Sequence, residues 1–145
     1  MKILVCVDGS EQSQRALEEA IKIAQERELE KALIIYVAST PSTVPEVYSR
    51  QFIELEKELE KKVREKGEEI LSQAQEEFKK NGLEADTILQ FGHPSETITR
   101  VASEQEIDLI VIGSRGLGGL KALLLGSVSN AVAQKTSSNV LIVKK

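Results

Sequence analysis

The sequence predicts an α/β fold: a single domain in which an open parallel sheet of five strands carries four helices on its two faces. Short apolar runs of strand length alternate with longer segments of helical periodicity, and this alternation favours a parallel sheet covered on both faces. Leu109–Ile112 is a continuous apolar run, as expected of a strand buried on both faces. The chain has 145 residues, 41% of them hydrophobic, which suits one domain, 1–145, with its own core.

The first strand and the first helix are predicted from the N-terminal residues. Lys2–Val7 is apolar and β-branched, and Asp8–Ser10 is typical of a turn. Ser10 can cap the helix that follows. The apolar residues of that helix recur at helical spacing, at Ala16, Leu17, Ala20, Ile21 and Ala24. Ala32–Val37 is the next run of strand length and is predicted as the second strand.

A loop and one long helix are predicted next. Two prolines and several hydroxyl side chains argue against regular structure in Ser39–Pro45. Helical spacing of apolar residues then extends over Glu46–Lys80, with one interruption near Gly67. Asn81 and the glycine after it end this helix.

The second half of the chain continues the alternation of strand and helix. Pro94 suits the first position of a helix, and a further helix is expected to begin at Ser127. The predicted elements are strands Ala85–Phe91, Asp108–Ile112 and Asn139–Lys144 and helices from Pro94 and over Ser127–Lys135. No apolar run approaches the roughly 18 residues that a membrane span needs, so no membrane partner is expected.

Composition excludes several classes of function. The chain has 19 basic and 23 acidic residues, and its net charge of −4 argues against a general nucleic-acid binder. Cys6 is the only cysteine and His93 the only histidine, which excludes an internal disulfide and a zinc site of the Cys/His kind. A cytoplasmic location, in reducing cytosol, is expected.

The charge is distributed unevenly along the chain. Residues 1–107 hold 22 acids and 14 bases, a balance of −8, whereas residues 108–145 hold one acid, Asp108, and five bases, a balance of +4. The 37 residues after Asp108 contain no carboxylate side chain. Two interpretations stay open on charge alone: glutamate-rich solvated helices happen to lie early in the chain, or the C-terminal third faces an anion.

Ligands of open parallel sheets bind beyond the carboxyl ends of the strands, near the point where the strand order reverses. The loops of interest are therefore Asp8–Ser10, the segment after Val37, and the run that starts at Gly113. That last run has four glycines in seven residues, which would let backbone N–H groups approach a ligand closely.

A second glycine element follows that loop. Gly126 opens a helix whose first turn holds the hydroxyls of Ser127 and Ser129. The N–H groups and the dipole at such a helix N-terminus favour a phosphate or another anion.

Neither of the two common glycine motifs for nucleotides is present. A Walker loop needs a lysine directly before Ser127, and the chain has none there. A dinucleotide fingerprint fits Gly116 and Gly118 but meets Lys121 at its third glycine. On the glycines alone, a tight connection that binds nothing is an equal alternative.

The spacing of the glycines is more specific. Gly113-x2-Gly116-x9-Gly126-Ser127 resembles the adenine-nucleotide motif G-x2-G-x9-G-[ST] of the universal stress protein family. The resemblance extends over the whole chain. Further similar segments are Ile3–Ser10, Gly92–Pro94, Asp108–Gly113 and Ser138–Val143.

This resemblance implies a strand order of 3-2-1-4-5 and a bound ATP, with Mg²⁺ or Mn²⁺ on its phosphates. It implies that Asp8 lies near the ribose and phosphates, where it could also contact the metal ion, and that Val37 lines the adenine pocket. The remaining implied contacts are Ile112 and Gly113 beside the nucleotide, Gly116 where the backbone closes on the phosphates, and Gly126, Ser127, Val128 and Ser129 around the phosphate tail. Two departures, Cys6 and Asn139 in place of prolines, remove no phosphate donor.

The resemblance also implies a homodimer that pairs through Val140–Val143, which would otherwise be an exposed apolar sheet edge. Together these features predict an ATP-binding stress-response or regulatory protein with slow or no hydrolysis, because no catalytic base or arginine finger is evident. The alternative is an enzyme on the same fold, a slow ATPase or a nucleotidyl transferase. A purely structural dimerisation module is the third hypothesis.

Overall fold

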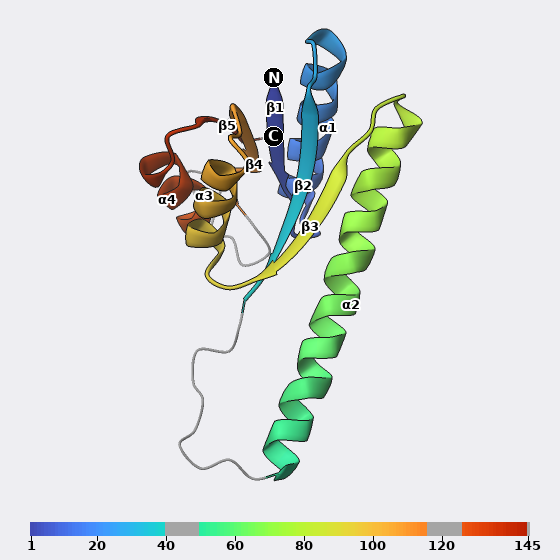
Figure 1. Ribbon diagram of the computed structural model, residues 1–145, viewed down its shortest axis with the longest axis vertical. Coiled ribbons are helices and arrows are strands. Elements are labelled where there is room, and N and C mark those ends of the chain that lie inside the picture. The colour runs from blue at the N-terminus through green and yellow to red at the C-terminus, as the bar shows by residue number, and fades with distance from the viewer. Residues whose placement is uncertain (40–49, 116–125, 145) are drawn as a thin grey trace.

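The computed structural model describes residues 1–39, 50–115 and 126–144 (Figure 1). The strands are β1 (Lys2–Cys6), β2 (Lys31–Ala38), β3 (Asp86–Phe91), β4 (Leu109–Gly113) and β5 (Asn139–Val143). The helices are α1 (Glu11–Glu26), α2 (Arg50–Lys80), α3 (Pro94–Glu104) and α4 (Ser127–Lys135). These bounds agree with the predicted elements to within one or two residues at each described end, and positions 46–49 of the predicted long helix lie outside the described residues.

The five strands form one parallel sheet in the order β3-β2-β1-β4-β5. This confirms the predicted α/β class and the strand order that the resemblance implied. In the register of the sheet, Val5 of β1 pairs with Ile34 of β2 on one side and with Val111 of β4 on the other. The chain order reverses between β1 and β4, so the carboxyl ends of these two strands form the switch point of the sheet.

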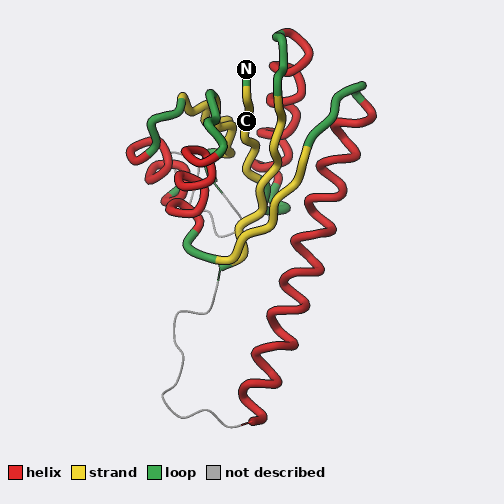
Figure 2. Tube along the Cα trace, viewed as in Figure 1, coloured by secondary structure: helices red, strands yellow, loops and turns green. Residues whose placement is uncertain are grey.

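Two apolar cores form because successive strand residues face opposite sides of the sheet. In β1, Ile3 and Val5 belong to the core under α1 and α2, whereas Leu4 and Cys6 belong to the core under α3 and α4. Figures 1 and 2 show the two helix pairs on opposite sides of the strands. Among the residues that the structure describes, no helix is long and apolar enough to span a membrane.

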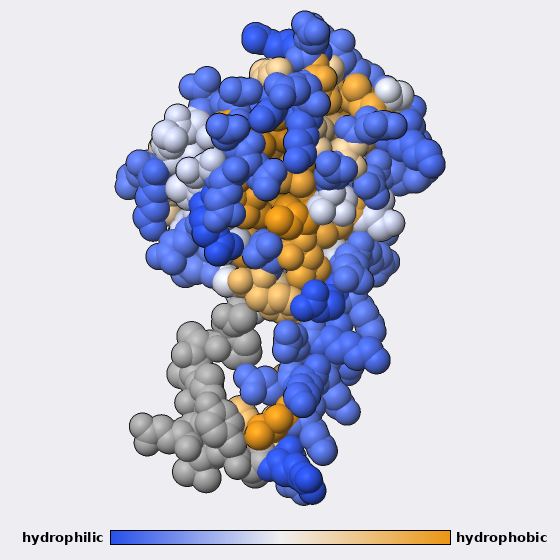
Figure 3. All heavy atoms as spheres, viewed as in Figure 1, coloured by the Kyte–Doolittle hydropathy of each residue, from blue (hydrophilic) through white to orange (hydrophobic). Residues whose placement is uncertain are grey.

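Helix α2 is the longest element, and its N-terminal half extends beyond the sheet (Figure 1). The side chains of Leu55 and Leu59 in that half are 54% and 51% exposed, whereas Leu71 and Phe78 in the other half are buried. Figure 3 shows mostly hydrophilic side chains along the extended half on the face in view. The apolar spacing that predicted the helix therefore fits a core contact only in its C-terminal half.

Gly67 explains the interruption in the apolar pattern of α2. A Cβ atom at Gly67 would lie 2.7 Å from Cδ1 of Tyr36 and 2.8 Å from Cδ1 of Leu89. The helix thus crosses β2 and β3 at a position where a side chain does not fit. One turn earlier, the Arg64 guanidinium lies 4.9 Å from the centre of the Phe91 ring.

Replacing Gly67 tests this crossing. We expect Gly67→Ala to lower the free energy of unfolding by about 1 to 2 kcal/mol, because overpacking against Tyr36 outweighs the better helix propensity of alanine. Urea unfolding measures the change, with Glu68→Ala at the exposed neighbouring position as the control. A gain in stability for Gly67→Ala, as propensity alone would give, would contradict this packing.

Candidate functional site

The candidate site lies at the carboxyl edge of β1 and β4, where the strand order reverses. β1 leads there into the turn before α1, and β4 leads into Ser114. Gly126 and the start of α4 return to the same edge, since the N–H of Gly126 donates to the carbonyl oxygen of Ser114 at 2.6 Å.

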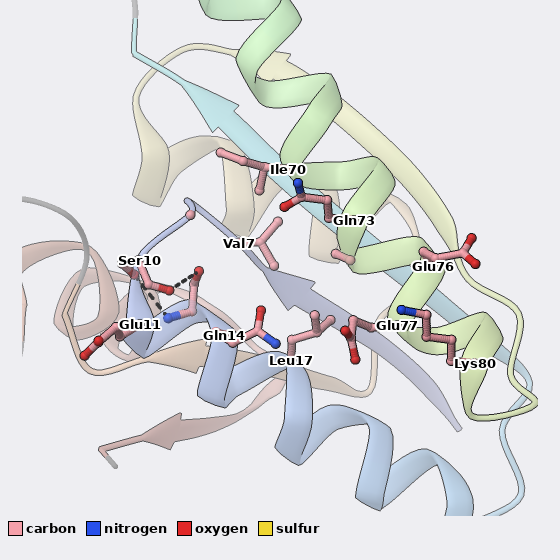
Figure 4. A pocket seen from close by; sticks show the side chains of 13 residues that line it. Val7, Ser10, Glu11, Gln14, Leu17, Ile70, Gln73, Glu76, Glu77 and Lys80 are labelled. Carbon is pink, nitrogen blue, oxygen red and sulfur yellow. Dashed lines mark hydrogen bonds between the residues drawn. The ribbon is translucent and has the colours of Figure 1, made fainter.

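Asp8 holds the turn between β1 and α1. Its Oδ1 accepts a hydrogen bond from the N–H of Ser10 at 2.9 Å, and its own N–H donates to the hydroxyl of Ser13 at 3.2 Å. The Ser10 hydroxyl in turn accepts from the N–H of Ser13 at 3.1 Å and caps α1, as Figure 4 shows. Asp8 is half-buried and stabilises this turn. Its contact with a ribose or a metal ion stays a prediction.

The charge of Asp8 also affects two neighbouring side chains. Burial raises the pKa of the Cys6 thiol above its usual range, and the nearby Asp8 carboxylate adds to the increase. Burial, with the same carboxylate as a smaller cause, raises the pKa of the Tyr36 phenol. The Cys6 thiol therefore stays protonated at neutral pH and acts as a small apolar residue of the core rather than as a nucleophile.

Two glycines of the predicted motif are required by packing within the chain. A Cβ atom at Gly113 would lie 2.8 Å from the backbone carbonyl group of Gln12, so glycine lets the first turn of α1 pack against the end of β4. A Cβ atom at Gly126 would lie 2.9 Å from the carbonyl oxygen of Ser114. These contacts fit the tight connection that the glycines alone left open as an alternative to ligand approach. Gly116, the remaining predicted glycine, lies outside the described residues.

Ser114 connects these segments, although it is not among the site residues predicted from the sequence. Its N–H donates to the carbonyl oxygen of Val143 at 2.9 Å, and its hydroxyl donates to Oε1 of Gln12 at 3.3 Å. Its carbonyl oxygen accepts from the N–H of Gly126 and from the Ser129 hydroxyl, the latter at 3.0 Å. The sequence holds one hint of this role, the position of Ser114 between two glycines of the motif.

The N-terminus of α4 has the features of an anion site. Its N-cap, Gly126, supplies no side-chain hydrogen bond, and its first turn contains no acidic residue. By contrast, α1 is capped by the Ser10 hydroxyl and carries Glu11 in its first turn, and the first turn of α3 carries Glu96. The first N–H groups of a helix have no partner within it, so those of α4 are suited to a negatively charged ligand.

The apolar residues predicted to contact the nucleotide lie on one side of the sheet. Val37, Ile112 and Val128 all pack against the core under α3 and α4. Ile112 is buried, while Val37 and Val128 are half-buried. Ser127 is exposed at the start of α4, whereas Ser129 is only 2% exposed. These three apolar residues and the N-terminus of α4, which no described side chain caps, thus lie on the same side of the sheet.

A separate groove of about 450 Å³ lies on the opposite face, between α1 and α2 (Figure 4). Val7 and Leu17 are among its apolar lining residues. Its charged lining residues are Glu11, Glu76, Glu77 and Lys80. Because three of these four charges are negative, the groove would repel phosphate groups, and none of the predicted site residues lines it. Within the described ranges, no three His, Cys, Asp or Glu side chains gather to hold a metal ion.

Comparison with known proteins identifies the family of this chain. The family model described as "Universal stress protein family" matches residues 1–144. The chain belongs to the universal stress protein family. The resemblance noted in the sequence is thereby confirmed at the level of the family.

Individual universal stress proteins match over nearly their whole length. Universal stress protein YxiE of Bacillus subtilis is 38% identical over 148 residues, with 99% of this chain and 98% of the relative covered. The structure of protein MJ0577, from Methanocaldococcus jannaschii, has a TM-score of 0.85 at 29% identity and covers 99% of this chain and 95% of its own. A universal stress protein in complex with cAMP has a TM-score of 0.71 at 28% identity, with coverages of 99% and 96%.

Proposed function

We propose that this universal stress protein binds ATP, together with Mg²⁺, at the carboxyl edge of β1 and β4, and that binding rather than turnover is its activity. The observation that carries the proposal is the uncapped N-terminus of α4, which is free of acidic residues and is placed at the switch point of the sheet. The related universal stress protein in complex with cAMP supports an adenine nucleotide as the ligand.

The described residues suggest how the nucleotide would lie. Val37, Ile112 and Val128, which lie on one side of the sheet, would form an apolar wall for the adenine ring. The N–H groups at the start of α4 and the exposed hydroxyl of Ser127 would hold the phosphates. Asp8 has its carboxylate at the same edge, which suits Mg²⁺, an ion usually held by one or two carboxylates and the phosphates themselves.

Slow or absent hydrolysis is part of this proposal. Phosphoryl transfer to water needs a group that orients the water and positive charge that neutralises the phosphates. The single histidine, His93, lies at the N-cap of α3, where its Nδ1 is 3.2 Å from the Ser95 hydroxyl. We therefore assign no catalytic role to His93.

Native mass spectrometry of the purified protein with Mg-ATP tests the proposed function, and steady-state turnover separates it from the enzymatic alternative. We expect bound ATP to persist unchanged for hours. Many turnovers per chain would instead favour a slow ATPase or a nucleotidyl transferase on the same fold.

We further propose that two copies pair through β5. This strand is at an edge of the sheet, and Val140, Leu141 and Ile142 are only half-buried in the single chain. Exposed apolar edge strands tend to be covered, and continuing the sheet into a second copy would cover this one.

Sedimentation equilibrium measures this assembly directly. We expect twice the chain mass of 16.0 kDa at micromolar protein concentration. A mass of 16.0 kDa across the accessible concentration range would contradict pairing through β5.

A further inference from the structure

The hydroxyl of Ser129 makes hydrogen bonds within the protein. It lies 3.0 Å from the carbonyl oxygen of Ser114, which is fifteen residues earlier in the chain, and 3.0 Å from that of Gly126. Ser129 is 2% exposed and Ser114 is 6% exposed. A serine hydroxyl has one proton to donate, and here two backbone carbonyl groups already share it. The contact of this hydroxyl with phosphate, implied by the family resemblance, would require these bonds to be given up.

The carbonyl oxygen of Ser114 joins the end of β4 to the beginning of α4. It accepts from the N–H of Gly126 at 2.6 Å as well as from Ser129. The Ser114 hydroxyl extends the same set of bonds to Gln12 in the first turn of α1. We call these four residues, Gln12, Ser114, Gly126 and Ser129, the Ser114 junction. Its bonds set the position of the first turn of α4 relative to the sheet.

We propose that Ser129 is a positioning residue, whose hydroxyl holds the first turn of α4 on the Ser114 carbonyl so that the N–H groups of this turn are placed for phosphate before the nucleotide arrives. This inference rests on the proposed function. A site that is already ordered loses less conformational freedom on binding, so its affinity is higher. Removing the hydroxyl frees the turn without removing any group that touches the ligand.

The chain offers a matched control in α3. Ser95 lies in the first turn of that helix, is 1% exposed, and its hydroxyl makes a local contact with His93. Ser95→Ala therefore removes an equally buried hydroxyl from the start of a different helix. A purely structural role for Ser129 would make Ser129→Ala and Ser95→Ala behave alike toward nucleotide.

The experiment compares the full-length wild type with Ser129→Ala, Ser129→Thr and Ser95→Ala. Affinity for Mg-ATP is measured by calorimetry, and amide hydrogen exchange over residues 126–130 is measured without nucleotide. We expect Ser129→Ala to weaken Mg-ATP binding about tenfold, the size expected from losing one neutral hydrogen bond, and to speed exchange in the ligand-free protein. Ser129→Thr keeps the hydroxyl, so we expect its affinity and its exchange rates to match those of the wild type. We expect Ser95→Ala to change neither the affinity nor the exchange over residues 126–130.

Two outcomes would overturn the inference while leaving the proposed function intact. One is wild-type affinity in Ser129→Ala. The other is weakened binding with unchanged exchange in the ligand-free protein, which would indicate that the hydroxyl contacts the phosphate directly. Failure of the wild type itself to bind Mg-ATP would overturn the proposed function, and this inference with it.

Discussion

Ser127→Glu is expected to weaken binding of Mg-ATP strongly while leaving the fold as stable as before or slightly more stable. Ser127 is exposed at the first position of α4, so the new side chain meets no steric barrier. A carboxylate at a helix N-terminus stabilises the helix by roughly 0.3–1 kcal/mol. The same carboxylate repels a triphosphate, and at about 1 kcal/mol per unit charge at 4 Å in water the loss of affinity should be about 10- to 100-fold.

This prediction is specific because the affinity for Mg-ATP falls while the stability of the fold stays the same or rises. Calorimetric titration gives the affinity, and urea unfolding gives the stability. Ser127→Gln is the control, because it has nearly the same size without the charge. The loss for Ser127→Glu should shrink at high salt, since it is electrostatic. Wild-type affinity in Ser127→Glu at low salt would mean that the phosphates lie elsewhere.

Gly126→Val is the second substitution with a large expected effect. The backbone of Gly126 has φ −62° and ψ 155°, which any residue can adopt, so only the contact with its neighbour excludes a side chain. Its Cβ would lie 2.9 Å from the Ser114 carbonyl oxygen and 3.2 Å from the Arg115 Cα. The start of α4 would have to move away from β4, and with it the N–H groups proposed to hold the phosphates.

We expect Gly126→Val to reduce the affinity for Mg-ATP by at least about 100-fold, since two or more hydrogen bonds to a charged group would be lost. Overpacking should also lower the free energy of unfolding by about 1–3 kcal/mol. Circular dichroism and urea unfolding establish that the variant is folded before binding is measured. If a folded Gly126→Val protein retains wild-type affinity, the nucleotide does not bind at the start of this helix.

The fold was predictable because two apolar patterns are clear in the sequence: continuous short runs for the strands and helical spacing for the helices. The continuous apolar run Leu109–Ile112 indicated a strand buried on both faces, and it forms β4, an interior strand of the sheet. The periodicity did not reveal where α2 leaves the sheet. Leu59 and Ala74 belong to the same apolar stripe, yet Leu59 is exposed and Ala74 is buried, because burial depends on how far the sheet extends beneath the helix.

The candidate site was predictable in part. The glycine spacing directed attention to Gly113 and Gly126, and the structure places both at the switch point. The spacing could not show that Gln12 packs on Gly113 or that the Ser114 carbonyl lies against Gly126, because these contacts join residues far apart in the sequence. Burial likewise separates Ser127, which is exposed, from Ser129, which is buried, whereas the sequence shows only two serines in the first turn of one helix.

Calorimetric titration of the wild-type protein with ATP in the presence of Mg²⁺ tests the central claim most directly. The start of α4 without a side-chain cap, the apolar residues proposed to contact adenine, and the family membership together predict saturable binding of one nucleotide per chain, well below millimolar ATP. Undetectable binding at millimolar ATP with Mg²⁺, by a protein shown to be folded, would contradict it.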